Sequence, residues 1–274
     1  MRAALFLVNL LLLGYLGFLL LNLYRSHNQL QLASIEQQQH LADKRALSLE
    51  SFLQDRSEDL IDLADKRQLS AYFENLSLGM SLEYGLGASL NDLQEALDRY
   101  RTRKQLNGKP LYQRILFVGA DRILLAGSHG ADAAVAGKKE YVACLSDKHQ
   151  RVKLFVQHSD SRHYLVFAYP YYFKDNYAGH LLAWINVDDL YRHFIISANS
   201  QKEFRNNLSL LHDDKEYLGT PDLPANCRIP LQSLPAPSRL KHGVQQLKLT
   251  LADSSQSLPV MAITSLPLAG TPLQ

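Results

Sequence analysis

The stretch HYLVFAYPYYFKDNYAGHLLAWINVDDL, residues 163–190, decides how this chain folds. It contains two runs rich in aromatic and branched apolar residues, 164–172 and 178–187, and such residues favour β-strands. The polar segment between them, Lys174-Asp175-Asn176, favours a turn, because short polar side chains bond their own backbone. The pattern therefore predicts an antiparallel hairpin.

Further strand-like runs lie on the N-terminal side of this hairpin. Residues 112–118 and 123–126, separated by the turn Ala120-Asp121, predict a second hairpin, and residues 152–157 predict a fifth strand. Together with the first hairpin they form a five-stranded antiparallel unit, which we place at residues 107–198.

A short helix is expected to close this unit over residues 188–196. Asp188 or Asp189 is its expected N-cap, because an Asp side chain accepts hydrogen bonds from the first free N–H groups of a helix.

The N-terminus has the composition of a membrane anchor. Residues 3–24 include no charge over 22 positions, and a bilayer core of about 30 Å needs about 20 such residues. No small-residue cleavage pattern follows, which argues against a cleaved signal peptide. Tyr24 and Arg25 suit the membrane interface. We therefore expect a transmembrane anchor over residues 1–25.

Helix-favouring residues continue past the anchor, and residues 26–106 are predicted to be a stalk with flanking helices. Ten positions spaced alternately by three and four form a seam, and eight of them are apolar. Such a seam suits a coiled-coil homodimer, or a helix packed on its own domain, and the two are compatible if each uses a different end. The seam positions are Leu32, Ile35, Gln39, Ala42, Ala46, Leu49, Leu53, Arg56, Leu60 and Leu63.

A smaller unit is expected over residues 199–274. Its strand-like runs are 208–212, 216–218, 244–252 and 260–265, with a proline-rich stretch between the second and third. We expect this unit to be incomplete by at least one strand.

Composition excludes some classes of function. The net charge is only +2, so the strong basic excess of a general nucleic-acid binder is absent. The two cysteines, Cys144 and Cys227, are expected to be separate thiols, although a single bridge stays open.

No enzyme motif stands out, so we expect neither catalysis, nor a metal, nor a cofactor. His158, His163 and His180 lie at strand ends and could converge, but they lack metal-ligand spacing. Ser128 beside His129 is not a nucleophile elbow.

Aromatic and polar side chains of the strands could line a small-molecule pocket. The alternative is ordinary sheet packing, because these residue types favour strands anyway. Lys153 alternates onto the same face as Phe155 and would suit an anionic ligand such as a carboxylate. The full set is Lys153, Phe155, Tyr164, Tyr169, Tyr171, Trp184 and Asn186.

The order of these elements resembles the double-Cache sensor domains of bacterial receptors. The local matches are residues 163–190 and the stretch YFENLSLGMSLEYGL, residues 72–86, which resembles the sensor region of some receptor histidine kinases. The resemblance implies an α+β chain in which a transmembrane helix runs into a long stalk helix, followed by two PAS-like antiparallel-sheet units. The membrane-distal unit would be residues 107–198 and the membrane-proximal unit residues 199–274.

The resemblance also suggests site residues. The amino-acid-binding branch of this family carries an Arg-x-x-Trp-Tyr stretch and a later Asp. On this sequence they fall near Lys138, at Glu140-Tyr141 and at Asn186. Only Tyr141 matches outright, so the resemblance does not imply an amino-acid ligand.

These observations predict the extracytoplasmic sensing module of a bacterial transmembrane receptor, in the inner membrane with its globular part in the periplasm. A small molecule would bind the distal unit, and the stalk would carry the change to an output domain of a two-component system outside this chain. The alternative is a membrane-anchored envelope assembly protein that binds a protein partner. A membrane-anchored hydrolase would require the three histidines to cluster with an acidic group.

Overall fold

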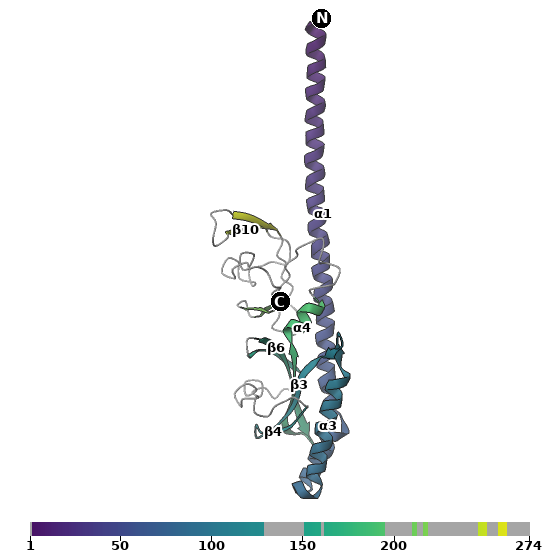
Figure 1. Cartoon of the computed structure of the whole chain (residues 1–274), viewed down its shortest axis with the longest axis vertical. Coiled ribbons are helices and arrows are strands. Elements are labelled where there is room, and N and C mark those ends of the chain that lie inside the picture. The colour runs from purple at the N-terminus through teal and green to yellow at the C-terminus, as the bar shows by residue number, and fades with distance from the viewer. Residues whose placement is uncertain are drawn as a thin grey trace.

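The computed structural model describes residues 2–128, 151–159, 162–194, 210–212, 216–218, 246–250 and 257–261. Its longest element is α1, Arg2–Ala64, a single helix of 63 residues. Figure 1 shows α1 projecting far beyond the sheet at its N-terminal end and lying beside the sheet at its C-terminal end. The segment Asn9–Leu30 of α1 is long and apolar enough to cross a membrane and is not buried by the rest of the chain. It overlaps the predicted span.

Three shorter helical segments complete the helix layer. They are α2, Arg67–Ser77, the π-helical turn η1, Leu82–Leu86, and α3, Gly87–Arg103. Gly79 and Gly85 have φ angles of +73° and +101°, a backbone region that glycine enters without a steric penalty. The glycines that interrupt the helical pattern in the sequence thus mark the breaks between helices.

Five antiparallel strands form the sheet, in the order β4-β3-β7-β6-β5. The expected strands are therefore confirmed, and their ends differ by at most two residues. A minor hairpin, β1 (Gln105–Leu106) and β2 (Lys109–Pro110), precedes the sheet. The sheet strands are β3, Tyr112–Gly119; β4, Leu124–Gly127; β5, Lys153–Ser159; β6, Arg162–Phe173; and β7, Asn176–Asn186.

The β6–β7 turn has the expected position. Phe173 pairs with Asn176, and the two residues between them, Lys174 and Asp175, have φ angles of +47° and +64°. Two successive positive φ values give the turn a twist that matches the flanking strands.

The short helix α4, Val187–Phe194, follows β7 directly. Its cap is not Asp188 or Asp189 as predicted. The Asn186 side-chain Oδ1 accepts a 2.8 Å hydrogen bond from the Asp188 main-chain N–H. Strand β7 ends at Asn186, so this residue occupies the position before the first helical turn, and both aspartates lie within that turn.

The main core lies between the helices and one face of the sheet, which we call the helix face. The C-terminal part of the predicted seam packs there, as shown by the burial of Leu49, Leu53, Leu60 and Leu63. Leu32, nearer the N-terminus, is 62% exposed. One end of the seam therefore packs on its own domain, as one alternative required, and Leu32 near the other end is exposed. Ile35, Gln39 and Ala42 have side chains outside the described part of the chain.

Beyond α4 the structure describes two hairpins. One pairs β8, Leu210–His212, with β9, Glu216–Leu218, and the other pairs β10, Gln246–Thr250, with β11, Ser257–Met261. Strand β11 begins at Ser257, earlier than predicted, because Ser257 pairs with Thr250. A complete second PAS-like unit at residues 199–274 stays a prediction.

Candidate functional site

The candidate site is the sheet face opposite the helices, which we call the Trp184 face. A second hydrophobic cluster lies on it, formed by side chains of β3, β6 and β7 and flanked by β4 and β5. Strand register aligns Phe155, Val166, Trp184 and Arg114 in one row across four strands. The side chains that lie on this face include Arg114, Lys153, Phe155, Gln157, Tyr164, Val166, Trp184 and Asn186.

Trp184 occupies the middle of this row and is 1% exposed. Its indole Nε1 donates a 2.7 Å hydrogen bond to Oε1 of Gln157, two strands away on β5. The Arg114 guanidinium lies 4.3 Å from the centre of the indole ring, close enough for a cation–π interaction. The only tryptophan of the chain is therefore held at its edge and on its face by two polar side chains.

The other end of the Gln157 amide has no such contact. Because the indole N–H needs an acceptor, the Gln157 oxygen faces Trp184 and Nε2 faces away. Nε2 is buried and has no hydrogen-bond partner among the residues that the structure describes. A buried donor without an acceptor is costly, and such atoms occur where a ligand or a water completes the bond.

A β-bulge at Gln113 brings Arg114 onto this face. Tyr112 pairs with Ile185 and Arg114 with Trp184, so one extra residue sits in β3. Tyr112 consequently packs in the core of the helix face, and Arg114 points to the opposite side of the sheet. The Arg101 side-chain Nε donates to the main-chain oxygens of Tyr112 and Gln113, at 3.1 and 3.0 Å, which fixes the bulge from α3.

The structure brings most of the predicted site residues together. Lys153, Phe155, Trp184 and Asn186 lie on the Trp184 face, and so does Tyr164. Asn186 has a second task, because its side-chain oxygen caps α4.

Tyr169 and Tyr171 lie on the other side of the sheet. Both belong to the core of the helix face, where the Tyr171 ring packs against Phe73 of α2 and Phe117 of β3, with centroids 5.5 and 5.8 Å apart. Burial raises the pKa of both phenols, assisted by the charge of Asp65. The Tyr169 and Tyr171 side chains lie on the opposite face of the sheet from Trp184, so they are not part of the same candidate site. Lys138 and Tyr141 lie outside the described residues.

The three histidines do not gather into one site. His158 and His163 are cross-strand partners, but His180 pairs with Pro170, seven residues along β6 from His163, or roughly 23 Å. The His180 ring instead bonds the Tyr177 hydroxyl. Among the described residues, no group of histidine, cysteine and acidic side chains has a metal-binding arrangement.

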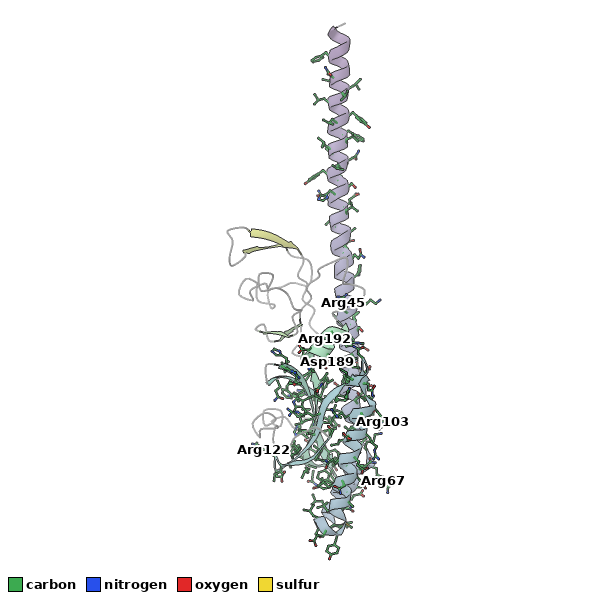
Figure 2. All side chains as sticks on the ribbon, in the orientation of Figure 1. Arg45, Arg67, Arg103, Arg122, Asp189 and Arg192 are labelled. Carbon is green, nitrogen blue, oxygen red and sulfur yellow. The ribbon has the colours of Figure 1, made fainter. Side chains whose placement is uncertain are left out.

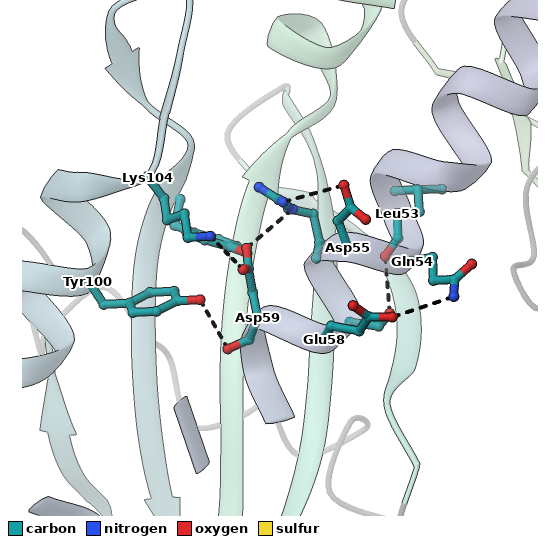
Figure 3. Close-up of polar contacts among 10 residues, drawn as sticks. Leu53, Gln54, Asp55, Glu58, Asp59, Tyr100 and Lys104 are labelled. Atoms are coloured by element: carbon teal, nitrogen blue, oxygen red, sulfur yellow. Dashed lines mark hydrogen bonds and ion pairs between the residues drawn. The ribbon is translucent and has the colours of Figure 1, made fainter. Parts of the chain in front are cut away.

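A second polar cluster lies between α1 and the sheet, around Asp59 (Figure 3). Asp59 is 5% exposed, and its carboxylate accepts hydrogen bonds from Lys104 Nζ at 2.8 Å and from the Tyr112 hydroxyl at 2.7 Å. Arg56 Nε lies 3.2 Å from the same carboxylate as an ion pair without hydrogen-bond geometry. The Tyr100 hydroxyl donates to the Asp59 main-chain oxygen at 3.2 Å.

These contacts set the ionisation of Asp59. Burial alone raises the pKa of the carboxyl, but the hydrogen bonds from Lys104 and Tyr112, the nearby Tyr100 hydroxyl and the Arg56 charge outweigh it. The pKa of Asp59 is therefore below its usual value. The pKa of Tyr112 is raised, first by burial and then by the Asp59 charge.

Sequence reasoning missed Gln157, Arg114 and Asp59. Gln157 alternates with Lys153 and Phe155, and strict alternation would have placed it on their face. Arg114 could not be placed this way, because alternation from Tyr112 sends both to one side and only the bulge separates them. Asp59 could have been noticed as a charge next to the apolar seam position Leu60.

Comparison with known proteins agrees with this fold. No protein-family model matches the sequence, and no curated protein sequence matches it. The ligand-binding domain of the Campylobacter jejuni chemoreceptor Tlp3 in complex with L-norvaline is similar, with a TM-score of 0.54 and 12% identity over 80% of this chain and 83% of that chain. The sensor domain of the V. cholerae histidine kinase DctB is also similar, with a TM-score of 0.50 and 8% identity over 69% of this chain and 67% of that chain.

The chain has the fold of bacterial sensory domains. The Tlp3 sensory domain with isoleucine bound matches over 79% of this chain, with a TM-score of 0.52 and 12% identity, so the similarity extends over most of the chain rather than over one motif. The expectation of an α+β sensor fold is confirmed.

Proposed function

We propose that this chain is the extracytoplasmic ligand-sensing module of a bacterial transmembrane receptor, and that it binds a small anion on the Trp184 face. The observation that carries the proposal is the buried Gln157 Nε2, a donor that no acceptor in the described part of the chain satisfies. It adjoins an indole fixed at its edge, a combination that binding sites use to orient a small molecule.

The charge on this face favours an anion. Arg114 and Lys153 are both cationic, and both side chains lie on this face. An amide N–H together with a guanidinium or ammonium group suits a carboxylate, because charge-assisted hydrogen bonds to an anion are the stronger kind. The Tlp3 domains are solved with amino acids bound, and each of these ligands carries a carboxylate.

The signal would leave through α1. This helix packs on the sheet with its C-terminal part and is continuous with the candidate span Asn9–Leu30 (Figure 1). A ligand can shift the helix only if it binds two arrangements of helix and sheet with different affinity. The candidate output, a receptor histidine kinase or another signalling domain, would lie on the far side of the membrane.

The exposed part of α1 suits a homodimer. Leu32, at the N-terminal end of the seam, is 62% exposed, whereas the seam residues Leu49, Leu53, Leu60 and Leu63 are buried against the sheet. Figure 2 shows apolar side chains projecting from α1 above the sheet.

Disulfide cross-linking of the full chain in membranes tests the homodimer, with Cys144 and Cys227 replaced by serine. Leu32→Cys should cross-link, and Gln37→Cys, about 140° around the helix, should not. Equal cross-linking at both positions would contradict the dimer seam.

An envelope protein that binds a protein partner is the second candidate, favoured by a separate observation. Large apolar side chains between α2 and α3 are exposed, at 72% for Leu78, 67% for Leu82 and 77% for Tyr84. Exposed apolar clusters of this kind occur at protein interaction sites.

A thermal-shift screen of the full chain in detergent against small carboxylates, amines and nucleobases tests the sensor function. A ligand at a hundredfold excess over its Kd stabilises the folded state by about 2.7 kcal/mol. We expect a carboxylate to raise the melting temperature, and the shift to be lost in Gln157→Leu but kept in Gln54→Leu on exposed α1. No shift with any compound, in a folded sample, would favour the protein-partner candidate.

A further inference from the structure

We propose that Asp59 is the coupling residue through which a change on the Trp184 face reaches α1. The direction of the signal rests on the proposed function, but the mechanical link stands on the contacts alone. Asp59 receives side-chain contacts from the end of α3 through Lys104 and from β3 through Tyr112 (Figure 3). Tyr100 of α3 adds a bond to its main chain.

Packing alone does not account for a charge at this position. Asp59 lies one residue before Leu60, inside a layer of buried leucines between α1 and the sheet. Replacing a buried ion pair by apolar residues is often neutral or stabilising, so stability is a weak reason for a carboxylate here. A carboxylate with directional bonds does something that leucine cannot, because it fixes the rotation and axial position of α1 against β3.

Tyr112 connects this cluster to the candidate site through the bulged backbone segment of β3. The bulge at Gln113 sends Tyr112 to the helix face and Arg114 to the Trp184 face, within three consecutive residues. Arg101 holds the two bulge carbonyls, so the segment moves as a unit with the end of α3. A displacement of Arg114 over the indole would therefore shift the Tyr112 hydroxyl, and with it the bond to Asp59.

The shift would then act on the membrane-facing part of α1. Asp59 and Leu30 lie in one uninterrupted helix, 29 residues or roughly 44 Å apart. A helix transmits rotation or translation along its axis when its hydrogen bonds are intact, and packed layers move between discrete arrangements rather than bending smoothly. Asp59 is thus the polar contact between α1 and the sheet that a switch between two such arrangements would change.

The chain carries its own reporter for this coupling. Trp184 is the only tryptophan, and it lies on the opposite face of the sheet from Asp59. Its emission maximum and its quenching by acrylamide, measured on the full chain in detergent, report the packing of the Trp184 face without any ligand.

Two variants remove the link with little change of shape. Asp59→Asn removes the charge, and Tyr112→Phe removes one hydroxyl. In both we expect the Trp184 emission maximum to shift and the acrylamide quenching constant to rise. Glu58→Gln is the matched control, because Glu58 is on the same helix, is exposed, and accepts its hydrogen bond from Gln54 on the exposed side of α1. Leu60→Val is the second control, because it loosens the same layer without touching the polar contacts.

Unchanged Trp184 emission and quenching in Asp59→Asn and Tyr112→Phe, with native circular dichroism, would overturn the proposal. An equal change in Leu60→Val would also overturn it, because the effect would then be general loosening. If Asp59→Asn fails to fold, Tyr112→Phe decides.

A reciprocal experiment covers the case in which neither variant folds. Thermodynamic coupling works in both directions, so Arg114→Met should alter hydrogen exchange of the α1 amides at 56–63 by about tenfold. Unaltered exchange there would refute the coupling. A failed ligand screen would leave these results untouched, because none of them needs a ligand.

Discussion

The indole Nε1 of Trp184 donates a 2.7 Å hydrogen bond to Oε1 of Gln157, and this bond joins β7 to the edge strand β5 across β6. Because it uses the Gln157 oxygen, it leaves the amide N–H₂ of the same side chain buried and without an acceptor within residues 2–128, 151–159 and 162–194 or the two described hairpins. One hydrogen bond therefore both orders the Trp184 face and creates its unsatisfied donor.

Replacing Gln157 tests how much the Trp184–Gln157 hydrogen bond contributes to stability. Gln157→Leu leaves the buried indole N–H without an acceptor, which should cost about 1–3 kcal/mol of unfolding free energy. Urea unfolding followed by circular dichroism measures the loss. Gln54→Leu, at an exposed position, should stay within about 0.5 kcal/mol of the wild type. A neutral Gln157→Leu would mean that the lost bond is offset, either by another acceptor for the indole or by removal of the unsatisfied Nε2.

Asp59 predicts a specific dependence of stability on pH. Its pKa is lowered on folding, so its contribution is full above the pKa of the unfolded chain and is lost as pH falls through the folded value. The difference in unfolding free energy between wild type and Asp59→Asn should therefore be full at about pH 6 and shrink below about pH 4. Urea titrations at both ends of this range measure it. A difference that stays constant with pH would show that the carboxyl does not titrate with folding.

Gly179 is expected to tolerate no side chain. Its φ is +153°, and an added Cβ would collide with the main-chain oxygen of Val118 on the neighbouring strand. Gly179→Ala should therefore separate β7 from β3 locally and cost about 3 kcal/mol. Gly108→Ala is the control, because Gly108 also has a positive φ of +75° but has nothing within 4 Å of an added Cβ. Similar melting temperatures for the two variants would contradict the close approach.

Asn186 is a predicted ligand residue that also caps α4, and two substitutions separate these roles. Asn186→Ala should lose about 1 kcal/mol, because the Asp188 N–H loses its acceptor, whereas Asn186→Asp keeps an acceptor and should keep the stability. Thermal unfolding measures both. If Asn186→Asp nevertheless loses the carboxylate-induced thermal shift, Asn186 also faces the ligand.

The sequence predicted the sheet closely and the site only in part. The strand-favouring runs within residues 163–190 and the turn at Lys174 and Asp175 are local features, which act over a few neighbouring residues. Alternation along β5 predicted correctly that Lys153 and Phe155 share a face, and the structure adds Trp184 and Asn186 of β7 to that face. Tyr169 and Tyr171 were grouped with them because the sequence does not say which face of β6 the helices cover.

By itself, the amino-acid sequence determined the apolar N-terminal helix, the five strands, the turns between them and the seam along α1. These follow from hydrophobic periodicity and from backbone preferences, which need no knowledge of distant residues. Only the tertiary structure decided which residues share the Trp184 face and why Asp59 is buried. It also decided that the bulge at Gln113 places the side chains of Tyr112 and Arg114 on opposite faces of the sheet. The reason is physical: a bulge and a buried carboxylate are stable only when partners far away in the sequence, Arg101 for the bulge and Lys104 and Tyr112 for the carboxylate, satisfy their polar groups.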